Sequence, residues 1–144
     1  MSESKAPAWK TQSTRGIIPH WPSKSIPDTI RFYRDVLHFT VGEPQYLREG
    51  YSEPTFVSVC LGRHCESNIY FFRRPEGEEP LHRGTGMIGM DAEGLLEDYY
   101  ETLRREGKVK FVENIEDKPW GYRQFEVADE DGNRIQFFRH LEDE

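Results

Sequence analysis

Ile69-Tyr70-Phe71-Phe72-Arg73-Arg74 is repeated 66 residues later as Ile135-Gln136-Phe137-Phe138-Arg139-His140. The same offset relates a second pair of patterns, Ile30-x-x-Tyr33-x-Asp35-x-Leu37 and Leu96-x-x-Tyr99-x-Glu101-x-Leu103. Two copies are too few for a solenoid, which needs at least about three repeats to bury a continuous core. The sequence therefore predicts one module written twice that closes on itself around a shared cleft.

Each copy carries the signals of a β-α-β-β-β unit. In the first copy, residues 16–74, we expect strands at 16–21, 39–46, 55–61 and 68–73, with a helix that starts behind Ser25 and ends near Leu37. In the second copy, residues 84–140, we expect a strand at 86–90, a helix at 93–105 that ends at Gly107, and three more strands, the last two at 122–128 and 134–139. Residues 1–15 form a flexible arm in this interpretation and residues 75–83 a linker. We predict an α+β fold in which two tandem βαβββ modules form curved sheets around a cleft, together one domain.

Composition and charge exclude several classes of function. The 144 residues are 35% hydrophobic and 13% aromatic, which is enough for one core, and no apolar run is long enough for a membrane span. The N-terminus lacks the apolar stretch of a signal peptide, so we expect a cytoplasmic protein. A net charge of −7 argues against nucleic acid and suits a cationic small molecule. Cys60 and Cys65 do not form a Cys-x-x-Cys pair, and we expect both to be reduced thiols.

Three motifs resemble a known family. Ile-Arg-Phe-Tyr-Arg-Asp-Val-Leu-His-Phe at 30–39 and Asp-Glu-Asp-Gly-Asn-Arg-Ile-Gln-Phe at 129–137 are similar to motifs of the glyoxalase/bleomycin resistance/dioxygenase superfamily, whose fold is called the vicinal oxygen chelate fold. Pro119-Trp120-Gly121 most closely resembles the bleomycin resistance proteins, in which this Trp lines a groove that sequesters a cationic glycopeptide antibiotic. His38 departs from the family pattern, which has Gly there. A left-handed backbone at this residue costs a His about 1 kcal/mol relative to Gly.

The resemblance also provides a test for a metal site. Metal-dependent members of the superfamily take one ligand from the first strand and one from the last strand of each module, usually His and Glu. Counting from the helical Tyr33, the matching first-strand positions are Ile18 and either Gly84 or Gly86, and the matching last-strand positions are Tyr70 and Gln136. An amide oxygen is a weak neutral ligand, and a phenol must first lose a proton with a pKa of about 10. We therefore expect no metal and no other cofactor.

Catalytic candidates remain open alternatives. His20, Tyr70 and Gln136 are the residues that a metal-free isomerase or cyclase on this scaffold would use. His20 or His82 could also serve a metal-dependent lyase, isomerase or dioxygenase as displaced ligands. His64, in a turn, and His140, in the C-terminal tail, are expected to face solvent.

Aromatic and acidic residues favour binding over catalysis. Trp120 lies on a turn beside Gly121, where its indole can project as a flat apolar wall. Tyr46, Tyr51 and Tyr122 can stack on a heteroaromatic ring and attract a cation. Acidic residues near these aromatics would steer a cationic ligand to the cleft, namely Glu49, Glu53, Glu113, Glu116 and Asp117.

The sequence therefore predicts a small-molecule-binding protein of the bleomycin-resistance type, which sequesters a cationic, aromatic antibiotic or metabolite and performs no chemistry. The alternative is an enzyme of the same superfamily that acts on a small organic substrate. The resemblance further implies a homodimer with an exchanged N-terminal strand and shared clefts. Pro19 falls where that strand carries a proline in the family, and a proline cannot donate to a continuous ladder.

Overall fold

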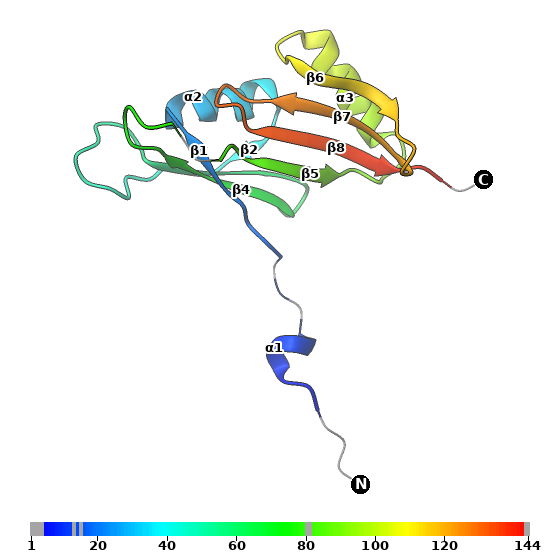
Figure 1. Ribbon diagram of the computed structural model, residues 1–144, viewed down its shortest axis with the longest axis horizontal. Coiled ribbons are helices and arrows are strands. Elements are labelled where there is room, and N and C mark those ends of the chain that lie inside the picture. The colour runs from blue at the N-terminus through cyan, green and yellow to red at the C-terminus, as the bar shows by residue number, and fades with distance from the viewer. Residues whose placement is uncertain (1–4, 13, 15, 80–81, 143–144) are drawn as a thin grey trace.

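The computed structural model describes residues 5–12, 14, 16–79 and 82–142, so parts of the predicted arm (1–4, 13 and 15) and of the predicted linker (80–81) lie outside the described residues. The chain forms two four-stranded sheets (Figure 1). The first has the order β1-β4-β3-β2, with β1 His20–Ser23, β2 Thr40–Val41, β3 Phe56–Leu61 and β4 Ser67–Arg73. The second has the order β5-β8-β7-β6, with β5 Thr85–Gly89, β6 Phe111–Asp117, β7 Tyr122–Ala128 and β8 Arg134–His140. The predicted duplicated α+β fold is confirmed.

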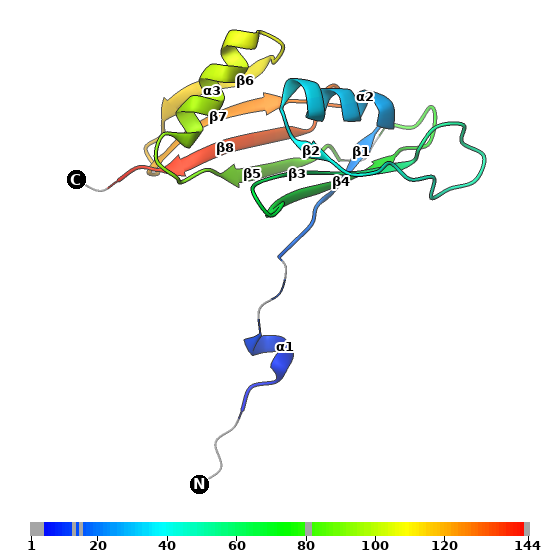
Figure 2. The same ribbon diagram turned by 180° about the vertical axis from the view of Figure 1, so that it is seen from behind.

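Helices follow the first strand of each module. They are α2 Ile26–Arg31, continued by the π-helical turn η1 Phe32–Val36, and α3 Leu95–Glu106. A short helix, α1 Ala8–Thr11, lies in the N-terminal arm, where no helix was expected. Figure 2 shows that α2 and α3 cover the same side of the two sheets, and Figure 1 looks onto the opposite side. Among the helices of the described residues, none has the length and apolarity that a membrane crossing requires.

The repeated motifs explain how the sheets bury one face. Ile69 and Phe71 in β4 are buried, as are Ile135 and Phe137 in β8. Successive side chains of a strand point to opposite faces, so the residues between them project to the side without helices. The helix-covered faces of both sheets contribute to one hydrophobic core. The helix-free side of each sheet is its open face.

The helix α2, continued by η1, ends in a left-handed turn at His38, although the departure from Gly there suggested that this turn is rebuilt. Ser25 caps its start by accepting a hydrogen bond from the backbone N–H of Asp28. His38 has φ 63°, and the N–H of Phe39 donates to the carbonyl of Tyr33 across the π-helical turn. His38 keeps this conformation although it is not glycine, and its Nε2 lies 2.6 Å from Glu106 of α3.

Two strands differ from their predicted ranges. The N-terminal strand was expected at 16–21 but spans His20–Ser23 and includes Pro22. Because β1 is an edge strand, Pro22 needs no N–H on its outer side. The strand expected at 39–46 is only Thr40–Val41, followed by an isolated bridge between Gln45 and Phe56. Glycine and proline at 42 and 44 account for this interruption, because both residues weaken a strand interior.

The two cysteines form a disulfide, so the prediction of reduced thiols is wrong. Cys60 is near the end of β3, and Cys65 lies in the turn that leads to β4. The turn brings their Cα atoms to 5.0 Å, which is within disulfide range. The absence of a Cys-x-x-Cys pair was the ground for expecting thiols, but a hairpin turn brings these residues, five positions apart, together.

A buried polar cluster ties the two modules together. Asn133 accepts a hydrogen bond from the N–H of Gly84 at 2.6 Å and donates to the carbonyl of Pro22 at 3.1 Å. It also donates to Asp129, which in turn accepts from the phenol of Tyr33 at 3.0 Å. Burial raises the pKa of the Asp129 carboxyl, although these donors oppose the shift. The turn at 129–133 therefore fastens module 2 to the first strand and the helix of module 1.

Candidate functional site

The open face of the first sheet carries a cluster of four rings. The ring of His20 lies 5.6 Å from that of Tyr70 and 4.9 Å from that of Phe72. Phe56 lies 5.0 Å from Tyr70 and 5.1 Å from Phe72. Three of the four rings are half-buried and His20 is exposed. This arrangement offers an apolar aromatic surface on which a planar molecule can stack.

Strand pairing shows which residue of the first strand lies beside the last strand in each module. His20 pairs with Tyr70, and Met87 pairs with Gln136. The assignment of Ile18 and of Gly84 or Gly86 to these positions is therefore wrong. Counting from Tyr33 placed the module 1 position at Ile18, before the strand, whereas His20 is the residue that pairs with Tyr70.

Gly84 and Gly86 serve packing instead. A Cβ on Gly84 would lie 2.2 Å from the indole of Trp21, and one on Gly86 would lie 3.2 Å from it. The two glycines leave room for the buried Trp21 at the junction of the modules.

The donor set at the four aligned positions does not fit the metal ion of the metal-dependent relatives. His20 and Tyr70 stand on module 1, and Met87 and Gln136 on module 2. Only His20 is a common ligand of divalent metals, since a thioether and an amide are weak donors and a phenol must ionise first. Within the described residues, no three His, Cys, Asp or Glu side chains come together as a possible metal site. His82 and His64 are both exposed.

The 42–55 loop presents a tyrosine that already faces two cations. The guanidinium carbons of Arg48 and Arg73 lie 4.8 and 5.9 Å from the ring centroid of Tyr51. Tyr46 is 63% exposed, and both Glu49 and Glu53 are exposed. Across the described residues, neither of these glutamates takes part in an ion pair. The loop therefore carries the predicted aromatic and acidic groups, together with arginines that the sequence argument did not consider.

The open face of the second sheet carries Trp120 at its edge. The β6–β7 turn places Trp120 59% exposed, and its indole N–H donates to Gln124 at 3.4 Å. Gln124 is only 2% exposed and donates to Glu113 at 3.4 Å. Gly121 has φ 95°, which suits glycine in this turn. Trp120 is thus an exposed aromatic side chain whose indole is oriented by Gln124, and Gly121 provides the turn on which it lies.

Lys118 covers this wall. Its ammonium lies 5.5 Å from the ring centroid of Trp120 and 2.8 Å from Glu113, and it also contacts Glu116. The side chain of Lys118 is only 13% exposed. Hydrogen bonds to Glu113 and Glu116 raise the pKa of Lys118. The sequence argument missed this lysine, although its position one residue before Pro119 was a usable signal.

Tyr122 belongs to a second aromatic group on the same face. Its ring lies 4.8 Å from that of Phe138 and 4.9 Å from that of His140. His140 is exposed, as the sequence suggested, and its Nδ1 lies 3.0 Å from Asp91.

The candidate residues fall into two separate groups. His20 and Tyr70 lie together, and the loop at 42–55 belongs to the same module. Trp120, Gly121 and Tyr122 belong to the other. Figures 1 and 2 show the 42–55 loop and the turn at 118–121 at opposite ends of the molecule. One chain therefore does not bring Tyr51 and Trp120 into one cleft.

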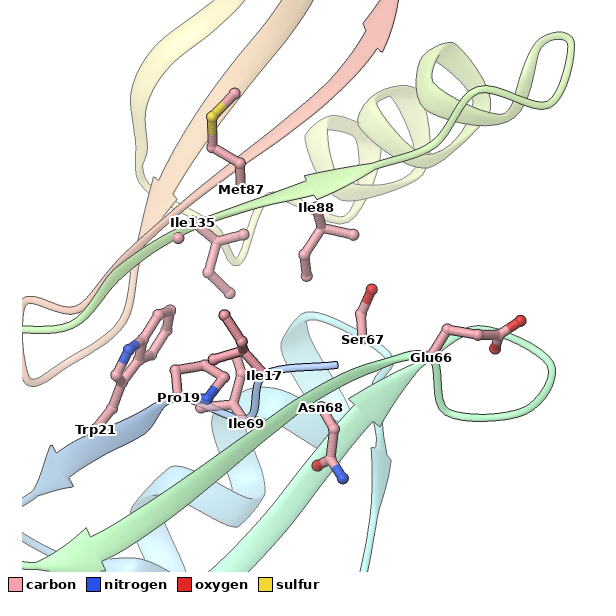
Figure 3. Close-up of a pocket in the computed structure, with 11 residues that line it drawn as sticks. Ile17, Pro19, Trp21, Glu66, Ser67, Asn68, Ile69, Met87, Ile88 and Ile135 are labelled. Atoms are coloured by element: carbon pink, nitrogen blue, oxygen red, sulfur yellow. The ribbon is translucent and has the colours of Figure 1, made fainter. Parts of the chain in front are cut away.

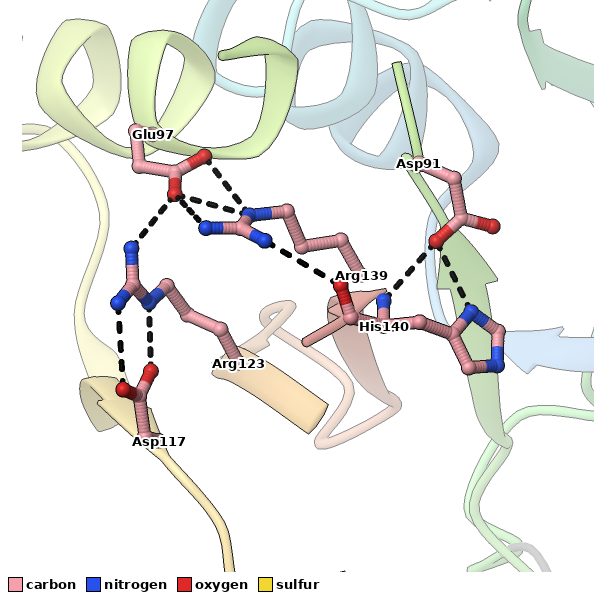
Figure 4. A network of polar contacts seen from close by, with 6 residues as sticks. All are labelled: Asp91, Glu97, Asp117, Arg123, Arg139 and His140. Carbon is pink, nitrogen blue, oxygen red and sulfur yellow. Dashed lines mark hydrogen bonds and ion pairs between the residues drawn. The ribbon is translucent and has the colours of Figure 1, made fainter. Parts of the chain in front are cut away.

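An ion-pair network lies at the start of α3, on the helix-covered face (Figure 4). Glu97 accepts hydrogen bonds from Arg139 and Arg123, and Arg123 also pairs with Asp117 at 2.6 Å. Hydrogen bonding to Arg139, supported by Arg123, lowers the pKa of Glu97 to about 2. Asp117, which was expected to steer a cationic ligand, is thus an ion-pair partner of Arg123. The hydrogen bond from Arg123 lowers the pKa of Asp117.

The seam between the modules contains an apolar cavity of about 190 Å³. Figure 3 shows Pro19 and Trp21 facing Ile88 and Ile135 across it. Its described lining includes none of the catalytic or ligand-binding residues that the sequence suggested. The lining nevertheless includes Met87, the module 2 residue that pairs with Gln136, so the cavity reaches the open side of the sheets where the two modules meet.

Sequence comparison identifies the family. A model described as the Glyoxalase/Bleomycin resistance protein/Dioxygenase superfamily matches residues 21–137. The chain belongs to this superfamily. The matched range begins in β1 and ends in β8, so it includes both modules. No match was found among curated proteins.

Several solved structures show the same fold. A glyoxalase/bleomycin resistance protein/dioxygenase from Nocardioides is 19% identical with a TM-score of 0.65, covering 95% of this chain and 91% of that chain. TioX from Micromonospora sp. ML1 is 16% identical with a TM-score of 0.62, and the match covers 87% of this chain and 98% of TioX. A glyoxalase-related enzyme from Clostridium phytofermentans is 17% identical with a TM-score of 0.65, and the match covers 92% of this chain and 99% of that chain. At these identities the likeness concerns the fold alone.

Proposed function

We propose that this superfamily member is a small-molecule-binding protein that sequesters a planar, cationic aromatic compound, as a bleomycin resistance protein does. The observation that carries the proposal is the exposed indole of Trp120 beside carboxylates on the open face of the second sheet. An indole face attracts a cation by about 0.5 to 2 kcal/mol, depending on how far the pair is removed from water. The four rings on the first sheet offer the stacking surface for the rest of the molecule.

The binding unit in this proposal is a homodimer related by a two-fold axis. Both open faces lie on the same side of the chain, and the 42–55 loop and the turn between β6 and β7 lie at opposite ends of it (Figure 1). A second copy can bring its Trp120 turn opposite the His20 and Tyr70 cluster of the first, and symmetry repeats this contact. Each cleft then contains the first module of one copy and the second module of the other.

The N-terminal arm is the segment available for exchange in this dimer. In the structure β1 pairs in parallel with β4 of its own chain. The arm before it projects from the body, with Trp9 78% exposed and Ile17 93% exposed. We propose that residues 5–12 and 16–18 reach the partner while Pro19, whose carbonyl accepts from the N–H of Tyr70, and β1 stay with their own sheet.

Titration with bleomycin tests sequestration directly. We expect quenching of tryptophan emission that saturates, and weaker binding at higher salt because the protein carries a net charge of −7. Liquid chromatography with mass spectrometry of the recovered compound should show an unchanged retention time as well as an unchanged mass, because an isomer has the same mass as its parent. The absence of saturable binding to bleomycin and to simple aromatic cations would contradict the proposal.

A metal-free isomerase or cyclase is the second candidate. It is favoured by the exposed His20 ring beside the Tyr70 ring on an open face. A chemically converted compound recovered from the titration, with conversion lost in His20→Ala, would support this candidate against sequestration.

A further inference from the structure

The cation site beside Trp120 is already filled by the protein itself. Lys118 has its ammonium 5.5 Å from the indole centroid and 2.8 Å from Glu113, and it contacts Glu116. Only 13% of its side chain is exposed. An external cation that used the same indole face and the same two carboxylates would occupy the space of this ammonium.

Removing the ammonium would leave a complete receptor for a cation. Glu113 would keep only its contact with the amide of Gln124, and Glu116 would lose its ion-pair partner. Trp120 would keep its orientation, because its N–H is held by Gln124 and not by Lys118. The hydrogen bonds to both carboxylates keep Lys118 protonated, since they raise its pKa.

We infer that Lys118 is a specificity-determining residue: its ammonium competes with the cationic group of the ligand for Glu113, Glu116 and the face of Trp120. This inference rests on the proposed function. A cationic ligand exchanges its charge for that of the lysine, so the wild-type site gains little from the charge itself. The site therefore selects for a planar ring that can displace the lysine, and less for charge alone.

Two planar probes of the same ring system, which differ in charge and by one methyl group, separate these effects. N-methylacridinium is a permanent planar cation, and acridine at pH 8 is its neutral counterpart. By isothermal titration calorimetry, we expect wild-type protein to bind the two with similar affinity. Lys118→Met keeps the aliphatic stem but removes the charge, and it should bind N-methylacridinium about tenfold more tightly, with acridine changed less than about twofold.

A matched variant and a second substitution control this experiment. Lys110→Met removes an exposed lysine just before β6 and should leave both affinities unchanged. Lys118→Gln replaces the charge with a polar group and should favour the cation as Lys118→Met does. Equal or weaker N-methylacridinium binding by both Lys118 variants, in a wild-type protein that binds it, would overturn the inference.

Acylation of Lys118 provides a second readout. The amine should react slowly with an N-hydroxysuccinimide ester in the free protein because it is buried and ion-paired. Saturating N-methylacridinium should speed this reaction several-fold by displacing the side chain, as measured by peptide mass spectrometry. An unchanged rate at saturation would overturn the inference while leaving the proposed function intact. Failure of wild type and both variants to bind either probe would overturn both.

Discussion

Asn133→Ala is expected to destabilise the fold by about 3 to 4 kcal/mol. Asn133 is 1% exposed and makes hydrogen bonds to Gly84, Pro22 and Asp129. The alanine leaves the buried N–H of Gly84 and the half-buried groups of Pro22 and Asp129 without this partner. An unsatisfied buried polar group costs about 1 to 3 kcal/mol. Because the bonds reach both modules, the loss should affect the whole core and not one hairpin.

Urea denaturation followed by circular dichroism measures this loss. The control is Asn114→Ala, because Asn114 is exposed and makes only a 3.5 Å contact with Tyr100. Its stability should stay within about 0.5 kcal/mol of wild type. A loss below about 1 kcal/mol in Asn133→Ala would show that the turn does not fasten the modules together.

Trp120→Ala is expected to weaken binding of the cationic aromatic ligand by about 10-fold to 100-fold. The variant removes the indole face and its contact with Gln124. Loss of one aromatic stacking contact typically costs about 1 to 3 kcal/mol, which corresponds to this range. The fold should not change, because Trp120 is 59% exposed and lies outside the core.

Two further variants isolate the role of the indole in the same calorimetric titration. Trp120→Phe keeps an aromatic face but loses the N–H donor, so we expect an intermediate affinity. Leu95→Ala removes another exposed apolar side chain, at the start of α3 on the helix-covered side, and should leave the affinity within about twofold of wild type. If Trp120→Ala binds as tightly as wild type, Trp120 is not part of the binding site.

Strands with regular alternation could be predicted closely from the sequence. The ranges expected for β4 and β8 differ from the structure by one residue, because buried Ile69, Phe71, Ile135 and Phe137 alternate with half-exposed residues. The first strand was expected at 16–21, but only His20–Ser23 pair with β4. The apolar Ile17 and Ile18 extend the strand-like pattern toward the N-terminus, although both are exposed and lie outside the sheet.

The candidate site was predicted in parts but not as an arrangement. Trp120 was expected to be exposed, and the Pro119–Gly121 turn explains why it is. That Lys118 folds back over it depends on the position of Glu113 on the neighbouring strand, and β6 carries irregular register there. The separation of Tyr51 from Trp120 is a property of the whole fold, and no local pattern in the sequence reports it.

In the proposed dimer, each cleft combines the first module of one chain with the second module of the other. Tyr70→Ala damages the first module's face, and Trp120→Ala damages the second module's face. Co-expression of the two variants with different tags, followed by purification through both tags, yields the mixed dimer. Light scattering should give it twice the 17.0 kDa mass of one chain.

Calorimetric titration of this mixed dimer with N-methylacridinium is the decisive measurement. A cleft shared between chains places both substitutions in one site and leaves the other site intact. We expect one site per mixed dimer with wild-type affinity, whereas the dimer of either single variant should bind weakly at both of its sites. A mixed dimer without any site of wild-type affinity would contradict the shared cleft, because every site would then lie within one damaged chain.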